Sequence, residues 1–353
     1  MRNIYSQIPE FSKEITPLVI ATVIFTRGSA PQKAGSSALF SRDGLIDGTI
    51  GGGVLEGRVM QLASEAAVSG YSGIHNFELD KSIEHKTEAI CGGEVSVLIE
   101  SRADKYVTAF QSIDGFLQGR KPCAVLTVIK GISGDQIQID RMVVTKETLG
   151  DLPDELRDRV SVVTRKLLDD ASGDNFLTLG SGKPGEKKDE LILVEALFPL
   201  PQLVIAGAGH IGKALHHLGK LLDFEVTVID DRTDYANPVN LPDATYIIVK
   251  DVGEAVSELD ISKDTYIVIV TRGHNDDGIA LRECIKSNAR YIGMIGSRTK
   301  IEKMRRNFIE NGWANEKQWN AIHSPVGIEI NSRTVQEIAV SIAAEMILVR
   351  NST

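Results

Sequence analysis

The segment from Leu203 to Asp231 constrains the fold of this chain more strongly than any other stretch. It reads LVIAGAGHIGKALHHLGKLLDFEVTVIDD: an apolar run, a Gly-x-Gly-x-x-Gly turn, an amphipathic run, a second apolar run and two acidic residues. Within the turn, Gly207 permits a sharp change of direction, Gly209 lets a phosphate approach the backbone, and Gly212 lets the helix lie close to the strand. The segment therefore predicts the strand, helix and strand of a Rossmann-like unit.

The same segment predicts a site for an anion. The expected helix begins near His210 with free N–H groups and the positive end of its dipole. Asp230 and Asp231 stand at the tip of the second strand, where the Asp230 carboxylate can accept from a ribose. If the ligand is a dinucleotide, Asp230 disfavours a 2′-phosphate, so NAD is expected over NADP. A histidine within the glycine turn departs from the small residue often found there. A pterin phosphate or another nucleotide is therefore a second interpretation.

Charge and cysteine content exclude several classes of protein. A net charge of -9 and a pI near 5.4 argue against a nucleic-acid binder. The three cysteines have no CxxC or CxxH spacing, so neither a disulfide framework nor a structural zinc site is indicated, and a reduced, cytoplasmic location is expected. The N-terminus is polar, and no apolar run approaches the roughly 18 residues of a membrane span.

The rhythm of the sequence changes at Phe198-Pro-Leu-Pro201, from β-rich to alternating strand and helix. Strands are expected at Thr245–Val249, Tyr266–Val270 and Arg290–Ile292, which is typical of an open parallel sheet covered on both faces. We therefore expect an α/β protein with two domains. Residues 1–199 form a mixed α+β domain, and residues 200–353 form a doubly wound, mostly parallel Rossmann-like domain.

Ligands of such sheets bind beyond the carboxyl ends of the strands. Polar residues follow two further strands there, and His274 and Arg298 are expected to face the crevice that holds Gly209 and Asp230. His274 has several interpretations: a base, a hydrogen-bond donor, a metal ligand or a plain surface histidine. Ser297 is expected to cap a helix that starts at Arg298 and to leave a further anion site behind it.

The first domain carries a second candidate anion site. A hairpin is followed by Gly51, Gly52 and Gly53 and then by an amphipathic helix that contains Glu56. Successive glycine N–H groups form a concave nest for an anion, to which Arg27 or Arg58 can add charge. A tight turn packed on a neighbouring strand is the alternative interpretation.

One cysteine has unusual neighbours. Cys91 precedes Gly92 and Gly93, whose small size leaves the sulfur approachable by a large ligand, although an isolated cysteine is commonly a small buried apolar residue. Cys123 and Cys284 fit that second description. The last helix, opened by the capping box Thr334–Glu337, is expected either to cover the sheet or to form a dimer contact, and a symmetric homodimer is the default expectation.

Taken together, these motifs resemble the XdhC/CoxI family from about Thr22 to the C-terminus. The motifs that carry the resemblance are Arg27-Gly-Ser-Ala-Pro31, Gly48-Thr-Ile-Gly-Gly-Gly-Val-Leu-Glu56, Cys91-Gly-Gly-Glu94, Gly207-Ala-Gly-His-Ile-Gly212, Asp230-Asp-Arg232, Thr271-Arg-Gly-His274, Tyr291-Ile-Gly-Met-Ile-Gly-Ser-Arg298 and Glu337-Ile-Ala-Val-Ser-Ile-Ala-Ala-Glu345.

The resemblance implies a chaperone of the molybdenum cofactor. Such a protein holds the cofactor while a cysteine desulfurase supplies the terminal sulfur, and it delivers the cofactor to an apo molybdenum hydroxylase of the xanthine dehydrogenase type. For such a cofactor, the first domain offers one candidate for each of its parts. These are Gly51–Gly53 with Arg27 for the phosphate, Cys91 near molybdenum or sulfur, and Glu56 for the pterin or for a structural role. We expect these three segments to meet at one site.

Two other functional classes stay open. An NAD-dependent oxidoreductase would use the Rossmann crevice for hydride transfer, and an NAD-sensing regulatory protein would bind the dinucleotide without turnover. The sequence leaves open whether the molybdenum cofactor binds in the first domain or in that crevice.

Overall fold

The computed structural model describes residues 3–79, 93–132, 137–170, 173–180 and 190–352. The chain divides into two compact units between Pro199 and Leu200, within the Phe198–Pro201 segment where the sequence changes its rhythm. Among the described residues, no helix is both long and apolar enough to span a membrane. Each unit is described separately below.

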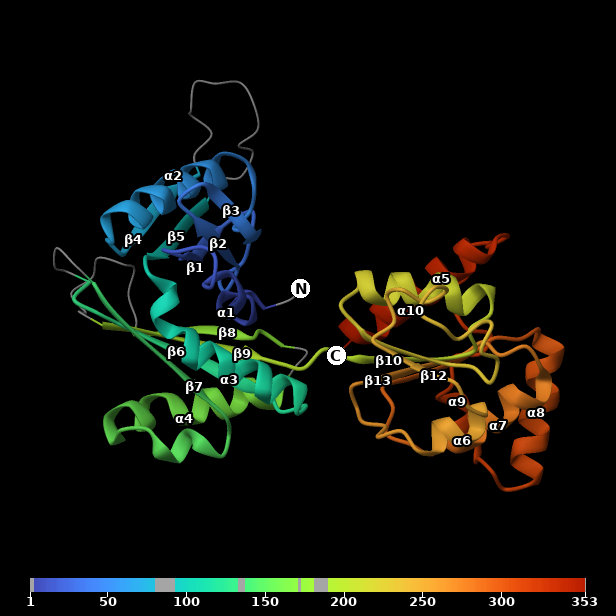
Figure 1. Ribbon diagram of the computed structural model, residues 1–353. Helices are drawn as coiled ribbons and strands as arrows, with labels where there is room; N and C mark the ends of the chain where they lie inside the picture. The colour runs from blue at the N-terminus through green and yellow to red at the C-terminus, as the bar shows by residue number, and fades with distance from the viewer. Residues whose placement is uncertain (1–2, 80–92, 133–136, 171–172, 181–189, 353) are drawn as a thin grey trace. The chain divides into compact units, whose positions relative to one another are not determined.

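The N-terminal unit is built on two antiparallel sheets (Figure 1). The first has the strand order β3-β2-β1-β5-β4 and the second the order β7-β6-β9-β8. The strands of the first sheet are β1 (Val19–Gly28), β2 (Ser37–Ser41), β3 (Gly44–Gly48), β4 (Gly73–Glu78) and β5 (Gly93–Glu100). Those of the second are β6 (Cys123–Lys130), β7 (Gln138–Val144), β8 (Phe176–Leu179) and β9 (Glu190–Leu197).

Helices cover these sheets and fill one end of the space between them. On the first sheet, α2 (Gly53–Ser69) buries Leu55, Val59 and Ala63 against one face. The outer face of the second sheet is covered by α4 (Asp154–Asp169). The short α1 (Ile8–Phe11) and α3 (Val107–Gln118) pack in the core between the sheets. The described residues of this unit also form three short 3-10 helices: η1 (Ile4–Ser6), η2 (Ala103–Tyr106) and η3 (Thr148–Asp151).

Local sequence explains why α2 begins and ends where it does. Gly52 forms the N-cap with a φ of 69°, and Gly70 ends the helix in the left-handed conformation with a φ of 73°. Both backbone shapes favour glycine because a Cβ atom would be strained there. The hairpin expected before the triple glycine is confirmed, since β2 and β3 pair antiparallel.

A largely buried network of polar and charged side chains links the two sheets. Arg141 of β7 donates from Nε and Nη2 to Glu100 of β5, at 2.8 and 2.5 Å, and from Nη1 to the Tyr5 hydroxyl at 3.2 Å. That hydroxyl donates to Glu195 of β9 at 2.7 Å. Burial raises the pKa of Glu195 to about 7, although the Tyr5 hydrogen bond and the Arg141 charge oppose the shift. The network therefore ties the two sheets to the N-terminal segment.

The C-terminal unit confirms the doubly wound α/β prediction. Its parallel sheet has the order β12-β11-β10-β13-β14, so the direction of winding switches between β10 and β13. The strands are β10 (Gln202–Ala206), β11 (Glu225–Ile229), β12 (Tyr246–Ile248), β13 (Thr265–Ile269) and β14 (Tyr291–Met294).

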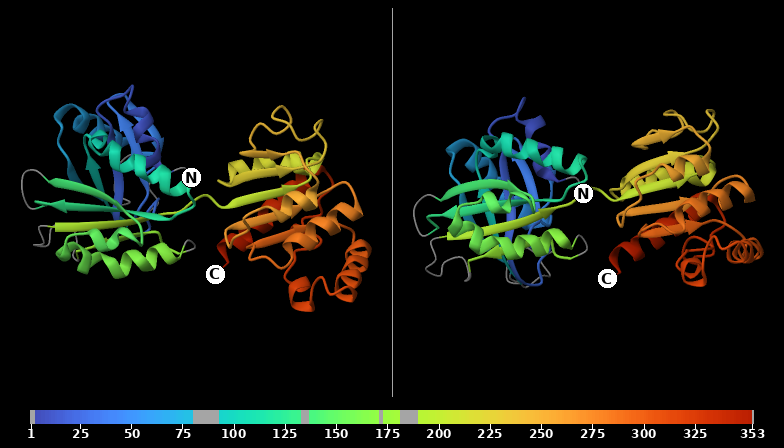
Figure 2. Two further views of the ribbon diagram at one scale, coloured as in Figure 1. Left: turned by 60° about the horizontal axis from the view of Figure 1, so that its bottom comes forward. Right: turned by 90° about the horizontal axis from the view of Figure 1, so that it is seen from below.

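Helices lie on both faces of this sheet (Figure 2). One face is covered by α5 (His210–Leu221) and α10 (Val335–Asn351). The other is covered by α6 (Val252–Ser257), α7 (His274–Cys284), α8 (Arg298–Glu310) and α9 (Glu316–Asn320). The predicted caps are confirmed: the Ser297 side chain accepts from Lys300 N, and Thr334 and Glu337 form the capping box of α10. The last helix therefore covers the sheet beside α5.

Candidate functional site: two glycine-lined anion cradles

The glycine turn of the C-terminal unit connects β10 to α5. A Cβ atom on Gly207 would lie 2.5 Å from Val270 O, and one on Gly212 would lie 1.9 Å from Gly207 O. These two glycines are therefore required by the packing of the turn. A Cβ on Gly209 would meet nothing within 4 Å, and Gly209 caps α5 without a side-chain hydrogen bond. The start of α5 is thus open, with first-turn N–H groups that the helix itself leaves unpaired.

Asp230 is already engaged inside the protein. Its side chain is 5% exposed; Oδ2 accepts from Ala208 N and from Arg232 Nη2, both at 2.8 Å. Oδ1 accepts from the backbone N and from Nε of Arg232. Burial alone would raise the pKa of Asp230, but these hydrogen bonds outweigh it and hold the pKa below its usual value. Asp230 therefore fixes the glycine turn, and recognition of a ribose by this carboxylate stays a prediction.

Two arginines follow strand ends at the carboxyl edge of the sheet, and neither was among the residues predicted for the site. Arg232 stacks 3.8 Å from the ring centre of Tyr235, and the half-exposed Arg272 follows β13. Arg272 Nη2 lies 3.4 Å from Asp231 Oδ2, so it bridges the ends of two strands. The sequence could have indicated both arginines, because each stands just after a strand that ends at the carboxyl edge of a parallel sheet.

A buried ion pair positions the neighbouring helices. Asp277 of α7 is fully buried and accepts from Thr271 N at 3.2 Å, from Thr271 Oγ1 at 2.5 Å, and from the ammonium of Lys300 of α8. The contact fixes α7 against the end of β13 and against α8. Gly273 caps α7 without a side-chain hydrogen bond, as Gly209 does for α5.

The other predicted residues of the crevice lie at helix starts. His210 and His274 are the first residues of α5 and α7, which follow the adjacent strands β10 and β13. His210 is exposed, and so are Ser297 and Arg298 at the start of α8. The carboxyl edge of the sheet thus brings together two glycine-capped helix starts and Arg272, an arrangement suited to a phosphate-bearing ligand. Binding of a dinucleotide there stays a prediction.

The triple glycine of the N-terminal unit is the second candidate anion site. Gly51, Gly52 and Gly53 have φ values of 124°, 69° and 58°, and a Cβ on either of the last two would meet nothing within 4 Å. Glu56 Oε2 accepts from Thr49 Oγ1 at 2.7 Å and from the backbone N of Ile50 at 3.3 Å and of Gly52 at 3.4 Å. Glu56 thus stabilises the turn, which is the structural role that the sequence allowed for it.

The Arg27–Pro31 segment lies between the other predicted segments. Gly28 pairs with Gly93, where a Cβ on Gly93 would lie 2.5 Å from Ser29 O. At the other end of the segment, a Cβ on Gly51 would lie 2.7 Å from Pro31 Cγ. Arg27 is 62% exposed, and its Nη1 lies 3.9 Å from Glu94 Oε1. The described residues therefore place Arg27, the triple glycine and Gly93 in one neighbourhood.

Cys91 and Gly92 lie outside the described residues, so their predicted roles stay predictions. Cys123 and Cys284 are buried free thiols, and burial raises the pKa of each to about 12. This agrees with the interpretation of both residues as small apolar core residues.

Comparison with protein families gives two matches. The family described as the XdhC Rossmann domain matches residues 203–346, and the XdhC and CoxI family matches residues 13–78. The first of these stretches contains the glycine turn of the crevice, and the second contains Arg27 and the triple glycine.

Similar proteins are known from three bacteria. An uncharacterized protein, YqeB, from Escherichia coli is 24% identical over 99% of this chain, which spans only 47% of that protein. A protein from Bacillus subtilis described as a probable subunit of xanthine dehydrogenase is 24% identical over 99% of this chain and 98% of its own length. A crystal structure described as a xanthine dehydrogenase from Bacillus halodurans has a TM-score of 0.74 at 23% identity, covering 98% of this chain and 95% of that one. This last likeness concerns the fold.

Proposed function

Because this chain belongs to the XdhC and CoxI family, we propose that it is an accessory protein that handles the molybdenum cofactor. It holds the cofactor while a cysteine desulfurase supplies the terminal sulfur, and it passes the cofactor to an apo molybdenum hydroxylase of the xanthine dehydrogenase type. It turns over no substrate of its own. The observation that supports the proposal is that the family-specific segment, residues 13–78, contains the triple-glycine turn and the open start of α2.

The described residues fit the phosphate of that cofactor. Helix α2 begins at Gly53, its N-cap Gly52 makes no side-chain hydrogen bond, and the surroundings of both glycines are open. Arg27 is exposed and adds positive charge to the same neighbourhood. Backbone N–H groups and a guanidinium bind phosphate reversibly through hydrogen bonds and charge. A protein that carries a cofactor and releases it needs such reversible contacts. We therefore assign the cofactor to the N-terminal unit.

Within this proposal, the chain's own residues bind and orient. The Glu56 carboxylate holds the triple-glycine turn in shape through Thr49 and the backbone N–H groups of Ile50 and Gly52. The turn then presents the start of α2 to the phosphate. When bound, the group supplies the molybdenum centre on which the recipient enzyme depends. Cys91 remains the proposed neighbour of molybdenum or sulfur.

A retention assay tests this assignment. The chain is mixed with isolated molybdenum cofactor and passed through a short gel-filtration column, and molybdenum and pterin fluorescence are measured in the protein fractions. Arg27→Ala should weaken retention about tenfold, a loss of about 1.4 kcal/mol of binding free energy. Arg165→Ala is the matched control because Arg165 is exposed on α4, which covers the other sheet. Equal retention by the two variants would contradict the assignment.

The Rossmann crevice favours a second candidate function, binding of NAD or another nucleotide. The supporting observation is the open start of α5 at Gly209 beside Arg272. An NAD-sensing protein would change NADH fluorescence on binding without turnover, whereas an oxidoreductase would also consume NADH when its substrate is added. Gly209→Val should abolish NADH binding in either case and leave retention of the molybdenum cofactor unchanged.

A further inference from the structure

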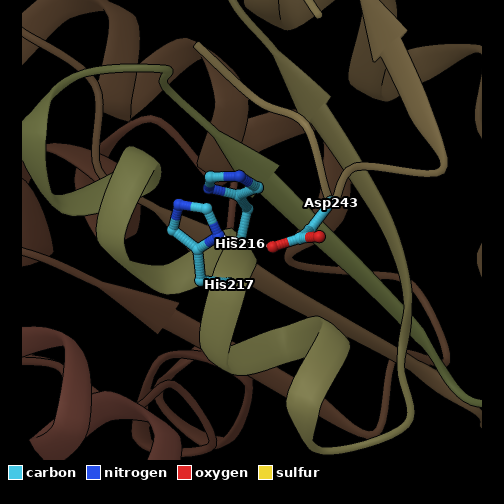
Figure 3. A group of neighbouring side chains, drawn as sticks. All are labelled: His216, His217 and Asp243. Atoms are coloured by element: carbon cyan, nitrogen blue, oxygen red, sulfur yellow. Dashed lines mark hydrogen bonds and ion pairs between the residues drawn. The ribbon is translucent and has the colours of Figure 1, made fainter. Parts of the chain in front are cut away.

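Two histidines and an aspartate gather in the C-terminal unit, away from both glycine cradles. His216 and His217 lie in the middle of α5, and Asp243 lies in the segment between β11 and β12 (Figure 3). One ring nitrogen of each histidine and one carboxylate oxygen of Asp243 lie within 4.8 Å of one another. His216 is six residues beyond the start of α5 at His210, about 9 Å along the helix axis. The group is thus separate from the glycine turn.

His216 is buried, yet one of its polar atoms has no partner. Its Nδ1 lies 2.5 Å from the carbonyl oxygen of Lys213, and because a carbonyl only accepts, this nitrogen carries the proton. Nε2 is then an unprotonated acceptor, and within the described part of the chain no hydrogen-bond donor reaches it. Burying such an atom without a partner opposes folding, so a ligand for Nε2 would explain its position.

The arrangement around His216 is the one that metal-binding histidines use. A histidine ligand commonly donates its other ring N–H to a carbonyl, which fixes the ring and the tautomer. With its proton on Nδ1, the His216 ring offers the lone pair of Nε2, which is the form of imidazole that binds a metal. The His217 and His216 ring centres lie 3.8 Å apart, which places two imidazoles at one point of the helix.

Asp243 supplies an anionic oxygen to the same group. Its Oδ2 lies 2.5 Å from Nδ1 of His217, and the carboxylate is 43% exposed. A second contact holds this segment against α5, since Lys213 Nζ donates to Asn240 Oδ1 at 2.7 Å. A simple surface pair of His217 with Asp243 would explain that one contact, but it would leave Nε2 of His216 without a role.

We propose that His216, His217 and Asp243 bind one divalent transition-metal ion of the zinc class. Two imidazoles and one carboxylate form a typical zinc ligand set, whereas magnesium and calcium prefer oxygen ligands alone. Ligand atoms of tetrahedral zinc lie about 3.3 Å apart. The half-exposed side chains of His217 and Asp243 reach that spacing by rotation, and a water molecule completes the coordination from the solvent side.

The ion would add a link between two elements that already share a core cluster, because Leu241 of the β11–β12 segment belongs to the same cluster as Leu215 of α5. It would fasten α5 to the segment between β11 and β12, which also carries Arg232 and Tyr235 beside the crevice. A metal that binds only the folded state raises the melting temperature. The proposal therefore predicts zinc-dependent stabilisation of the C-terminal unit.

Zinc titration of the whole chain tests the site. The chain is prepared without a histidine tag, stripped with a chelator and titrated with zinc sulfate by isothermal calorimetry, with magnesium chloride as a comparison. We expect one zinc per chain, no response to magnesium, and a higher melting temperature with zinc. His217→Ala and Asp243→Asn should each weaken zinc binding about tenfold or more. Both side chains are about half exposed, so the variants should keep the melting temperature of the metal-free chain.

Two further variants serve as controls. Asp260→Asn removes an exposed carboxylate elsewhere in the same unit, and His75→Ala removes a histidine from β4 in the other unit. Both should bind zinc as the unchanged chain does. Absence of zinc binding, or zinc binding that survives in both His217→Ala and Asp243→Asn, would overturn the proposal.

Discussion

Substitutions at Gly209, the N-cap of α5, and at Gly212, in the first turn of α5, test directly why each position is a glycine. A Cβ atom on Gly212 would lie 1.9 Å from Gly207 O, whereas ordinary carbon–oxygen contacts are about 3.3 Å or longer. Gly212→Ala therefore forces the backbone of the turn to move by roughly 1 Å or more, which should lower the free energy of unfolding by about 3 kcal/mol. For a domain of about 150 residues, this cost lowers the melting temperature by about 6–12 °C.

Gly209→Ala is the matched variant. Its Cβ would meet nothing within 4 Å, and the φ of -68° at Gly209 suits any residue. The alanine restricts the unfolded chain but is a poorer N-cap than glycine, and these small effects oppose each other. We expect the stability of this variant to stay within about 1 kcal/mol of the unchanged chain.

Tryptophan fluorescence during guanidinium unfolding is the assay. The sequence has two tryptophans, Trp313 and Trp319, and both pack in a core cluster of the C-terminal unit. The signal thus reports this unit alone. Equal stability of Gly212→Ala and Gly209→Ala would refute the argument that Gly212 serves packing while Gly209 serves a ligand.

Three other perturbations have defined outcomes. Burial raises the pKa of Glu195 from 4.5 to about 7, so between these pH values the folded protein holds a proton that unfolding releases. The free energy of unfolding therefore falls as the pH rises from 4.5 to about 7. When urea unfolding is compared at pH 5 and pH 8, Glu195→Gln should remove up to about 3 kcal/mol of this pH-dependent loss of stability. Asp277→Asn leaves the largely buried ammonium of Lys300 without its anion and should destabilise the C-terminal unit by about 3 kcal/mol in the fluorescence assay. An unchanged unfolding midpoint would contradict the role of the pair. Thr334→Ala removes the cap of α10 and should cost about 1 kcal/mol in calorimetry, and restoration by Thr334→Ser would separate the cap from packing.

The sequence predicted best those features that depend on neighbours along the chain. The β10–α5–β11 unit follows from two apolar runs and three glycines within one short stretch, and the caps at Ser297 and Thr334 follow from residues three positions apart. The hairpin before the triple glycine is equally local. In each case the side chain and the backbone that it serves lie in one short segment.

Features that join distant segments were not predicted. The buried network links Tyr5, Glu100, Arg141 and Glu195, and Tyr5 and Glu195 are 190 positions apart. The engagement of Asp230 by Arg232 depends on side-chain rotamers that no spacing specifies. His216 and His217 stood out only as part of an amphipathic helix, because Asp243 reaches them through the fold of a loop. Tertiary packing decides all three.

Molybdenum content tests the central claim most directly. The untagged chain is purified from cells grown with molybdate, and its molybdenum and oxidised-pterin fluorescence are measured against the same chain from cells unable to make molybdopterin. The proposed function predicts molybdenum and pterin together, approaching one of each per chain, only in the first preparation. A chain from molybdate-grown cells that carries neither would contradict the account.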